Sequence, residues 1–565
     1  MTTLYTRYAK DVNRACPHSY YPRPCLVRDS FLCLNGEWDF AINGVRGTVD
    51  YNEKILVPFP PESALSGIGR RVGTREYLHY RRNIVLPEGF FCGRIILHFG
   101  AVDGECEIFL DGKKIGESSL GILPFSIDVT EELSSGSAVL ELTVRDALDR
   151  AYPYGKQRTK RGGMWYTPHS GIWQSVWLES VPEKYITDLR LTPSLSGASL
   201  EVLGGETHKR ITLDSGEVFE FDGNEFFIEP KEIHLWSPED PYLYRFTLEC
   251  GEDRVMSYFA LREVGVGMTD GKRYLTLNGK PYLFNGLLDQ GYYSDGLILP
   301  ATEEGYLDDI RLAKSLGFNM LRKHIKIEPE IFYYLCDREG IAVFQDMVNN
   351  GSYSFLRDTA LPTVGIQRLP DFLLPRRRRT KEIFKEAMLK TAKHLYNHPS
   401  VVYYTVFNEG WGQFSADRMY ELLKSLDNTR IIDTTSGWFR QKKSDVDSRH
   451  VYFKRLAVKH PDGRPISVSE FGGYSYRVSQ HLATEKNYGY RLFESREEFE
   501  RAFFDLYLDE VLPLAECGAS AFVYTQLSDV EDETNGLVTY DREVVKVDPA
   551  ATREVMEKVK AAHLK

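Results

Sequence analysis

One stretch decides the fold of this chain: Val401-Val402-Tyr403-Tyr404-Thr405-Val406-Phe407-Asn408-Glu409-Gly410. It is a β-branched and aromatic run that ends in a carboxylate followed by glycine. The run Ile466-Ser467-Val468-Ser469-Glu470-Phe471-Gly472-Gly473 has the same form. A carboxylate at such a point leaves a strand and enters a loop, which in a parallel barrel forms the catalytic face. The two runs therefore predict barrel strands that carry Glu409 and Glu470 to one rim.

The sequence from residue 265 onward alternates between strand and helix patterns. Eight strands are predicted, namely Tyr282–Asn285, Phe318–Arg322, Ala342–Asp346, Val401–Asn408, Arg430–Thr434, Arg449–Tyr452, Pro465–Glu470 and Ala521–Gln526. Helical periodicity is found over Thr302–Ser315, Pro329–Arg338, Lys381–Tyr396, Ala416–Leu426 and Arg496–Leu512. Ser495 and Glu498 form a capping box before the last of these helices. Eight strand–helix repeats predict a (β/α)8 TIM barrel over residues 265–565, with Glu409 ending strand four and Glu470 ending strand seven.

The residues before 265 show strand and turn patterns with little helix. Runs such as Ile95–Phe99 and Ala138–Val144 are separated by turn pairs such as Asp111-Gly112. They predict an antiparallel β-sandwich over residues 1–180. Residues 181–264 continue in this style, with Trp236–Tyr244 leading into a strand, and predict a smaller immunoglobulin-like sandwich. The predicted fold class is therefore multidomain, β plus α/β.

The composition limits the partners and the compartment. The chain has 565 residues, a net charge of −11 and a pI near 5.8, which argues against nucleic acid or an anionic membrane as the main partner. The N-terminus lacks the apolar region of a signal peptide, and no apolar run is long enough to span a membrane. Eight cysteines are scattered without C-x-x-C spacing. These features predict a cytoplasmic protein.

Two carboxylates on one rim are the groups that glycoside hydrolysis requires. In a retaining enzyme one carboxyl group protonates the leaving oxygen and the other attacks the anomeric carbon, at a separation of about 5–5.5 Å. Glu409 is predicted to be the acid and Glu470 the nucleophile. Asn408 is positioned to donate to a sugar hydroxyl, Trp411 to stack on a sugar face, and Tyr452 to orient Glu470. Either glutamate alone would be interpreted as a loop carboxylate in a surface ion pair.

Other kinds of site are not predicted. The histidines lack metal-ligand spacing, so no metal is predicted and they are interpreted as satisfied or solvated side chains; they include His394, His398, His450 and His460. No nucleophile elbow, phosphate-binding loop or dinucleotide fingerprint is present, and no cofactor is predicted. An acidic cluster follows strand eight and is interpreted as a solvated loop, with a cation or sugar contact as the alternative; it comprises Asp529, Glu531, Asp532 and Glu533.

Several motifs resemble those of glycoside hydrolase family 2, the β-galactosidases, β-glucuronidases and β-mannosidases. Segments similar to the sugar-binding jelly roll of that family are Phe31–Phe40, Val57–Ser63 and Ser170–Leu178, and Trp236–Tyr244 is similar to its immunoglobulin-like domain. Barrel motifs of the family match Gly317–Arg322, Leu335–Gly340, Asn408-Glu409 and Ser469–Gly472. In this order and spacing the set is highly specific, and it covers nearly all of the chain.

The resemblance implies a jelly roll for residues 1–180 and net retention by an exo-enzyme that removes one terminal sugar. By the same resemblance Glu409 is the acid/base and Glu470 the nucleophile. Asn408 and Tyr452 are supporting residues, and Arg322 is an electrostatic support near the nucleophile. Family members are commonly oligomeric, so a homo-oligomer is expected.

Departures from the family pattern concern the substrate. Thr525 stands where the family usually has tryptophan, so a sugar-stacking wall is missing or is supplied by Tyr524. The Asn-x-Lys element of β-glucuronidases is absent near Asn535, where Glu533 would repel a uronate carboxylate, which argues against glucuronides. Galactose remains the default by family frequency. Weaker candidates for the substrate shell are Lys326, Asp289, Gln290, Asp346 and Trp165.

Three alternatives stay open. The first is another specificity of the family (β-mannosidase, β-glucosaminidase, uronidase or arabinosidase). The second is a non-catalytic carbohydrate-binding protein with a degenerate barrel. Internal cleavage of polymer chains is the third. Both glutamates and Asn408 are intact, which favours an enzyme over a binding protein.

Overall fold

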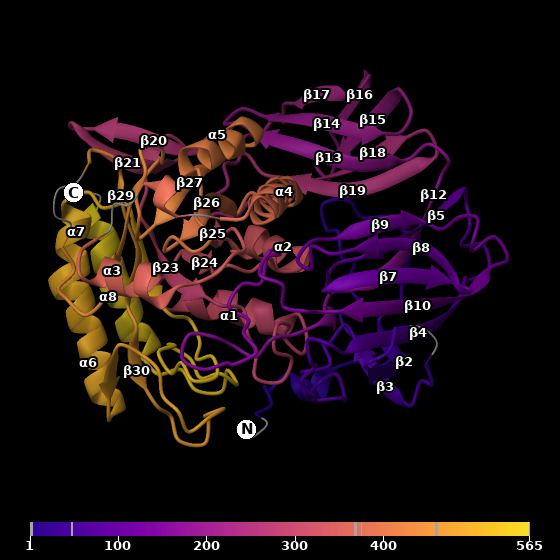
Figure 1. Cartoon of the computed structure of the whole chain (residues 1–565). Helices are drawn as coiled ribbons and strands as arrows, with labels where there is room; N and C mark the ends of the chain where they lie inside the picture. Colours follow the sequence, from indigo (N-terminus) through magenta and orange to yellow (C-terminus); the bar gives the residue numbers. More distant parts are fainter. Residues whose placement is uncertain (1–3, 47–48, 367–369, 375, 458–461, 564–565) are drawn as a thin grey trace.

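The computed structural model describes residues 4–46, 49–366, 370–374, 376–457 and 462–563. In chain order these residues form two antiparallel sandwiches and a parallel barrel. Figure 1 shows the first sandwich in indigo and violet on one side of the molecule, the second above it, and the barrel opposite. None of the helices in the described residues combines the length and the apolar character that crossing a membrane requires.

The first sandwich consists of a six-stranded sheet of order β3-β2-β4-β10-β7-β8 and a four-stranded sheet of order β1-β12-β5-β9. Alternate residues of β10 are buried, because successive side chains of a strand point to opposite faces. Its strands are β1 (Phe31–Cys33), β2 (Gly36–Asn43), β3 (Glu53–Val57), β4 (Tyr77–Val85), β5 (Arg94–Phe99), β6 (Val102–Asp103), β7 (Glu105–Leu110), β8 (Lys113–Ser118), β9 (Phe125–Asp128), β10 (Ser137–Arg145), β11 (Gly171–Ile172) and β12 (Val176–Val181), preceded by the short helix η1 (Ala9–Asp11).

The second sandwich pairs a three-stranded sheet, β13-β14-β17, with a four-stranded sheet, β16-β15-β18-β19. Its strands are β13 (Ile186–Pro193), β14 (Ala198–Gly204), β15 (His208–Leu213), β16 (Val218–Asp222), β17 (Glu225–Ile228), β18 (Tyr244–Cys250) and β19 (Asp253–Phe259). The boundaries at 180 and 264 stay predictions; β12 ends at Val181, and the next strand, β20, begins at Val264.

The barrel is a nearly closed sheet of eight parallel strands in the order β27-β26-β25-β24-β23-β32-β29-β28. All eight residues of β26 are buried, which explains its continuous apolar and aromatic sequence. The predicted fold class is confirmed, and each of the eight predicted strands overlaps an observed one. The barrel strands are β23 (Phe284–Asp289), β24 (Met320–Lys323), β25 (Ala342–Asp346), β26 (Val401–Asn408), β27 (Ile431–Ser436), β28 (Asp447–Val451), β29 (Ile466–Gly472) and β32 (Ala521–Thr525).

Helices cover the outside of the barrel, and α6, α7 and α8 line one flank in Figure 1. Ser495 caps α6 by accepting a hydrogen bond from the Glu498 backbone at 3.2 Å, as the capping box predicts. The long helix predicted over 496–512 is interrupted by a π-helical turn, η4. The helices are α1 (Glu304–Ser315), α2 (Glu330–Glu339), η2 (Leu356–Ala360), α3 (Leu361–Thr363), η3 (Asp371–Leu373), α4 (Arg378–His394), α5 (Ala416–Leu426), α6 (Arg496–Leu506), η4 (Tyr507–Val511), α7 (Leu512–Glu516) and α8 (Pro549–His563). The remaining strands are β20 (Val264–Thr269), β21 (Lys272–Leu277), β22 (Lys280–Pro281), β30 (Tyr474–Tyr476) and β31 (Arg491–Phe493).

Candidate active site

The two predicted carboxylates meet at the rim of the barrel. Glu409 directly follows β26 in a left-handed backbone conformation with φ 51°, and Glu470 lies in β29. One oxygen of each carboxylate and one ring nitrogen of His450 all lie within 4.8 Å of one another. This spacing fits a retaining glycosidase better than an inverting one, which separates its carboxyl groups by roughly 6.5–9.5 Å to admit a water.

His450 lies between the two glutamates. The sequence-based interpretation of His450 as a satisfied or solvated side chain missed this place in the site. Its Nδ1 is 2.9 Å from Oε1 of Glu409 and 3.4 Å from Oε2 of Glu470. A register shift between Arg449 and His450 in β28 pairs His450 with Glu470 of β29. Such a bulge re-aims side chains beside active sites. A side chain at Gly437 would meet the His450 ring at 2.5 Å, so glycine is required there.

Arg322 connects the site residues through hydrogen bonds. Its Nη1 donates to Oε1 of Glu470 at 3.0 Å, and its Nη2 donates to Oδ1 of Asn408 at 2.9 Å. Nε and Nη2 also donate to the two oxygens of Asp346, each at 3.0 Å. Asn408 accepts a further bond from Ser436, so its amide nitrogen is the atom left for a ligand. Arg322 therefore fixes the nucleophile candidate and the Asn408 side chain together.

Tyr452 holds the second oxygen of Glu470. Its hydroxyl donates to Oε2 of Glu470 at 2.8 Å and is 2.8 Å from Oγ1 of Thr525. The ring stacks on Tyr490 with a centroid distance of 4.1 Å. The arrangement fits the predicted role of orienting Glu470, and the role stays a prediction.

The environment shifts the pKa values of the two glutamates in opposite directions. Burial raises the pKa of Glu409, and the charge of Glu470 adds to that rise, although the His450 hydrogen bond opposes it. Burial also acts to raise the pKa of Glu470, but the charges of His450 and Arg322 outweigh it, so the pKa is lowered. One carboxyl group is thus suited to carry a proton and the other to stay ionised.

An aromatic wall joins the barrel to the first sandwich. Trp411, after β26, stacks on Trp165 with a centroid distance of 5.2 Å, and Tyr353 meets both rings edge-on. The guanidinium carbon of Arg158 lies 3.5 Å from the centre of the Trp165 ring. Trp165 belongs to the loop before β11, so the sandwich supplies one side of the site.

The acidic cluster after β32 is buried, which corrects the prediction of a solvated loop. Glu531 and Asp532 each pair with Arg161 at 3.1 Å, and Glu533 accepts a hydrogen bond from Tyr166. Asp529 pairs with Lys546 at 2.7 Å. Glu531, Asp532 and Glu533 therefore dock the loop of the first sandwich onto the barrel.

Two weaker candidates, Asp289 and Lys326, lie in a neighbouring buried network. Asp289 pairs with Lys323 at 2.6 Å, and Lys326 pairs with Glu328 at 2.7 Å while also donating to two backbone carbonyls. Neither forms a hydrogen bond or an ion pair with Glu409 or Glu470. The contacts of Asp289 and Lys326 suit a role in supporting the rim rather than in binding the sugar directly.

Tyr524 does not face the site, contrary to the prediction that it could supply a sugar-stacking wall. Its side chain is fully buried and packs between the barrel and α6, with its ring 5.0 Å from that of Phe503 and 5.8 Å from that of Phe471. Thr525, the next residue, contacts Tyr452 instead. Successive residues of a strand face opposite sides, so Thr525 faces the site and Tyr524 faces the helices. His460, which the sequence analysis interprets as a satisfied or solvated histidine, lies outside the described residues.

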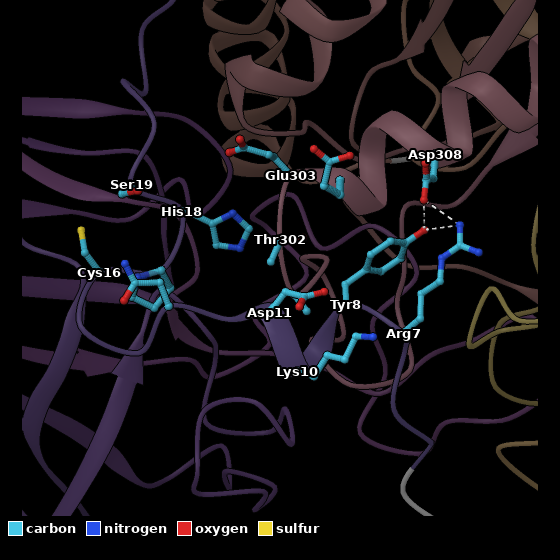
Figure 2. A pocket seen from close by; sticks show the side chains of 14 residues that line it. Arg7, Tyr8, Lys10, Asp11, Cys16, His18, Ser19, Thr302, Glu303 and Asp308 are labelled. Atoms are coloured by element: carbon cyan, nitrogen blue, oxygen red, sulfur yellow. Dashed lines mark hydrogen bonds and ion pairs between the residues drawn. The ribbon is translucent and has the colours of Figure 1, made fainter.

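A separate cavity lies between the N-terminal segment and the start of α1. It measures about 540 Å³, and its lining includes Arg7, Tyr8, His18, Glu303 and Asp308. Figure 2 shows Arg7 and Tyr8 both reaching Asp308, with His18 at the opposite end. The Arg7–Asp308 distance is 2.6 Å and the Tyr8–Asp308 distance is 2.7 Å. This cavity contains neither catalytic candidate.

Comparisons with known proteins agree with the barrel. A β-galactosidase of Aeromonas hydrophila is 27% identical over 479 residues, which cover 76% of this chain and 43% of that protein. A β-glucuronidase of Streptococcus agalactiae is 25% identical over 428 residues, covering 69% of this chain and 68% of that protein. This chain therefore spans less than half the length of the first of these relatives.

Solved structures share the fold over almost the whole chain. A β-glucuronidase of an uncultured Clostridium superposes with a TM-score of 0.74 at 20% identity, covering 94% of this chain and 98% of that one. A β-galacturonidase of Eisenbergiella tayi bound to galacturonate gives a TM-score of 0.69 at 20% identity, covering 96% of this chain and 99% of that one. Residues 267–546 match the TIM barrel domain of glycosyl hydrolases family 2. This stretch contains all eight barrel strands, so the barrel of this chain is a glycoside hydrolase family 2 barrel domain.

Proposed function

We propose that this chain is a retaining exo-β-glycosidase. The observation that carries the proposal is the pair Glu409 and Glu470, whose oxygens lie within 4.8 Å across His450 and whose pKa values shift in opposite directions. No metal or organic cofactor takes part in the proposed steps. Family membership and the β-galactosidase and β-glucuronidase relatives support this reaction class.

The reaction proceeds by two displacements. In the first, the Glu470 carboxylate attacks the anomeric carbon while Glu409 gives its proton to the glycosidic oxygen, which leaves with the aglycone. In the second, Glu409 takes a proton from water, the water oxygen attacks the anomeric carbon, and the bond to Glu470 breaks. Both inversions together retain the configuration. Asn408 donates to a sugar hydroxyl, and Tyr452 and Arg322 keep Glu470 ionised and oriented.

Action on a terminal sugar is supported by the loop of the first sandwich. Trp165 from this loop stacks on Trp411, and Arg161 pairs with the acidic loop after β32. These contacts close one side of the barrel mouth, whereas an enzyme that cuts inside a polymer needs an open cleft. A β-galactoside is the default substrate because several relatives are β-galactosidases.

An acidic sugar is a second candidate substrate, and Lys156 favours it. This lysine, from the sandwich loop, is 7% exposed, and among the described residues its ammonium forms no hydrogen bond or ion pair. It lies over the Tyr166 ring at 5.4 Å. Burial raises the pKa of Glu409, and the charge of Lys156 acts against that rise. A buried ammonium that acts on the acid electrostatically, and that forms no hydrogen bond or ion pair within the described part of the chain, is suited to bind a uronate carboxylate.

The residues that argue from sequence against uronides all lie in the loop after β32. There Glu533 accepts a hydrogen bond from Tyr166, and burial raises its pKa while the charge of Lys156 acts to lower it. The repulsion expected from Glu533 is thus reduced by its surroundings.

A hydrolysis panel of p-nitrophenyl glycosides tests the proposal. Wild type and Glu470→Gln are compared on β-galactoside, β-glucoside, β-mannoside, β-glucosaminide, β-glucuronide, β-galacturonide and α-L-arabinoside. Turnover of one sugar by the wild type alone supports both the class and the assigned site. Sugar binding without any turnover would favour a carbohydrate-binding protein. A homo-oligomer and a cytoplasmic location remain predictions, testable by light scattering and by fractionation.

A further inference from the structure

A second cluster of metal-ligating side chains lies away from the catalytic carboxylates. One ligand atom from each of Cys25, Glu330 and His398 lies within 4.8 Å of the other two. The three residues are far apart in sequence: Cys25 precedes β1, Glu330 begins α2, and His398 lies between α4 and β26. The N-terminal segment and two elements of the barrel therefore meet at one point.

The distance between sulfur and nitrogen is close to that of a metal site. Sγ of Cys25 is 4.0 Å from Nε2 of His398. Tetrahedral zinc with bonds of about 2.3 Å to sulfur and about 2.0 Å to nitrogen separates such ligands by roughly 3.5 Å. A movement of about half an ångström would bring the sulfur and the nitrogen to that separation.

The histidine is held in the orientation that a metal ligand needs. Nδ1 of His398 lies 2.8 Å from Oδ2 of Asp337, and the other oxygen of Asp337 accepts a hydrogen bond from the Ser400 backbone at 2.8 Å. Because Nδ1 is bonded to this carboxylate, Nε2 is the ring nitrogen that faces Cys25. Metal-binding histidines are commonly oriented by a carboxylate in this way.

Within the described ranges of the chain, Glu330 forms no ion pair with a lysine or an arginine. Its side chain is 13% exposed, and the nearest basic atom is Nδ1 of His394 at 3.5 Å. The neighbouring Arg23 pairs with Glu179 instead. A largely buried carboxylate in this position is stabilised by a cation.

We propose that Cys25, Glu330 and His398 bind a zinc ion that fastens the N-terminal segment to the barrel. A thiolate, an imidazole and a carboxylate form a mixed donor set that suits Zn²⁺ rather than Mg²⁺ or Ca²⁺. Binding displaces the thiol proton to solvent, and a water molecule takes the fourth position. Tyr258 of β19 lies 3.5 Å from the sulfur, so the second sandwich borders the site.

The proposal is tested by metal analysis of the full chain. Wild type, Cys25→Ala, Glu330→Gln and the control Cys106→Ala are incubated with Zn²⁺, passed over a gel-filtration column and analysed by plasma mass spectrometry. Cys106 is a suitable control because it is also buried but lies in β7 of the first sandwich. We expect one zinc per chain in wild type and Cys106→Ala, none in Cys25→Ala, and at least tenfold weaker binding in Glu330→Gln.

Cobalt substitution gives a second readout that does not depend on activity. Wild type loaded with Co²⁺ should show the near-ultraviolet charge-transfer band of a cobalt–thiolate bond, and Cys25→Ala should not. If Cys25→Ala does not fold, Glu330→Gln keeps the test intact, because glutamine preserves the shape of the side chain. Absence of stoichiometric zinc in the wild type, or equal zinc in Glu330→Gln, would overturn the proposal.

Discussion

Nδ1 of His450 lies 2.9 Å from Oε1 of Glu409, the proposed acid. The same nitrogen is 3.4 Å from Glu470, the proposed nucleophile. A single ring nitrogen therefore influences the protonation of both carboxyl groups. In the wild type His450 lowers the pKa of each of them, although burial is the largest influence on both.

Replacing His450 should move the whole pH profile. In His450→Ala the pKa of Glu470 rises, so the acidic limb of kcat/KM shifts to higher pH, and the pKa of Glu409 rises, so the alkaline limb shifts the same way. We expect a loss in kcat of about 10²-fold as well. His481→Ala is the control, because His481 pairs with Asp541 at 2.7 Å outside the site. Loss of activity with unmoved limbs would mean that His450 has only a structural role.

Glu409→Gln should affect substrates according to their leaving groups. Glutamine cannot deliver a proton, so a glycoside with a poor leaving group should lose about 10²- to 10⁴-fold in kcat/KM. A dinitrophenyl glycoside, whose leaving group needs no proton, should lose far less in the glycosylation step. The measurement is kcat/KM across a series of aryl glycosides. Equal losses along the series would exclude the acid role.

Tyr452→Phe and Tyr524→Phe form a matched pair of variants that tests where the two side chains lie. Tyr452→Phe removes a hydrogen bond to the Glu470 carboxylate, which is worth about 1.5–3 kcal/mol, so kcat should fall roughly 10- to 100-fold. Tyr524→Phe changes a side chain that is buried against Phe503, so kcat and KM should stay near wild type. Both variants are assayed on the best substrate of the panel. A larger loss in Tyr524→Phe than in Tyr452→Phe would contradict the placement of both residues.

Lys156→Met tests the acidic-sugar candidate. Methionine keeps the length of the chain and removes the ammonium, so kcat/KM for a β-uronide should fall about 10- to 100-fold, as for loss of a hydrogen bond to a charged group. Turnover of the matching neutral β-glycoside should change little. A control is Lys113→Met, since Lys113 pairs with Glu132 on the exposed surface of the first sandwich. An equal loss on both sugars would show that Lys156 does not select for charge.

The sequence predicts the barrel because its strands are buried on both faces. The run Val401–Asn408 consists entirely of β-branched or aromatic residues up to Asn408, and β26 has these same bounds. The positions of Glu409 and Glu470 follow from the same pattern, since a carboxylate after such a run lies at the rim.

Other features depend on contacts that the sequence does not specify. His450 reaches both glutamates because of a register shift in β28, and Lys156 acts on Glu409 from a loop of the first sandwich. The error at Tyr524 has a simpler cause. The register of a strand decides which of its side chains point into the barrel. A shift of the register by one residue exchanges the inward-facing and outward-facing side chains. The neighbour Thr525 takes the inward position.

The central claim, that Glu470 is the nucleophile of a retaining enzyme, is tested most directly by trapping the covalent intermediate. The enzyme is incubated with the 2-deoxy-2-fluoro analogue of its best substrate, digested, and sequenced by mass spectrometry. The account predicts one sugar per chain, attached to the peptide that contains Glu470, and no labelling of Glu470→Gln. A label on Glu409, or turnover to an inverted product without any label, would contradict it.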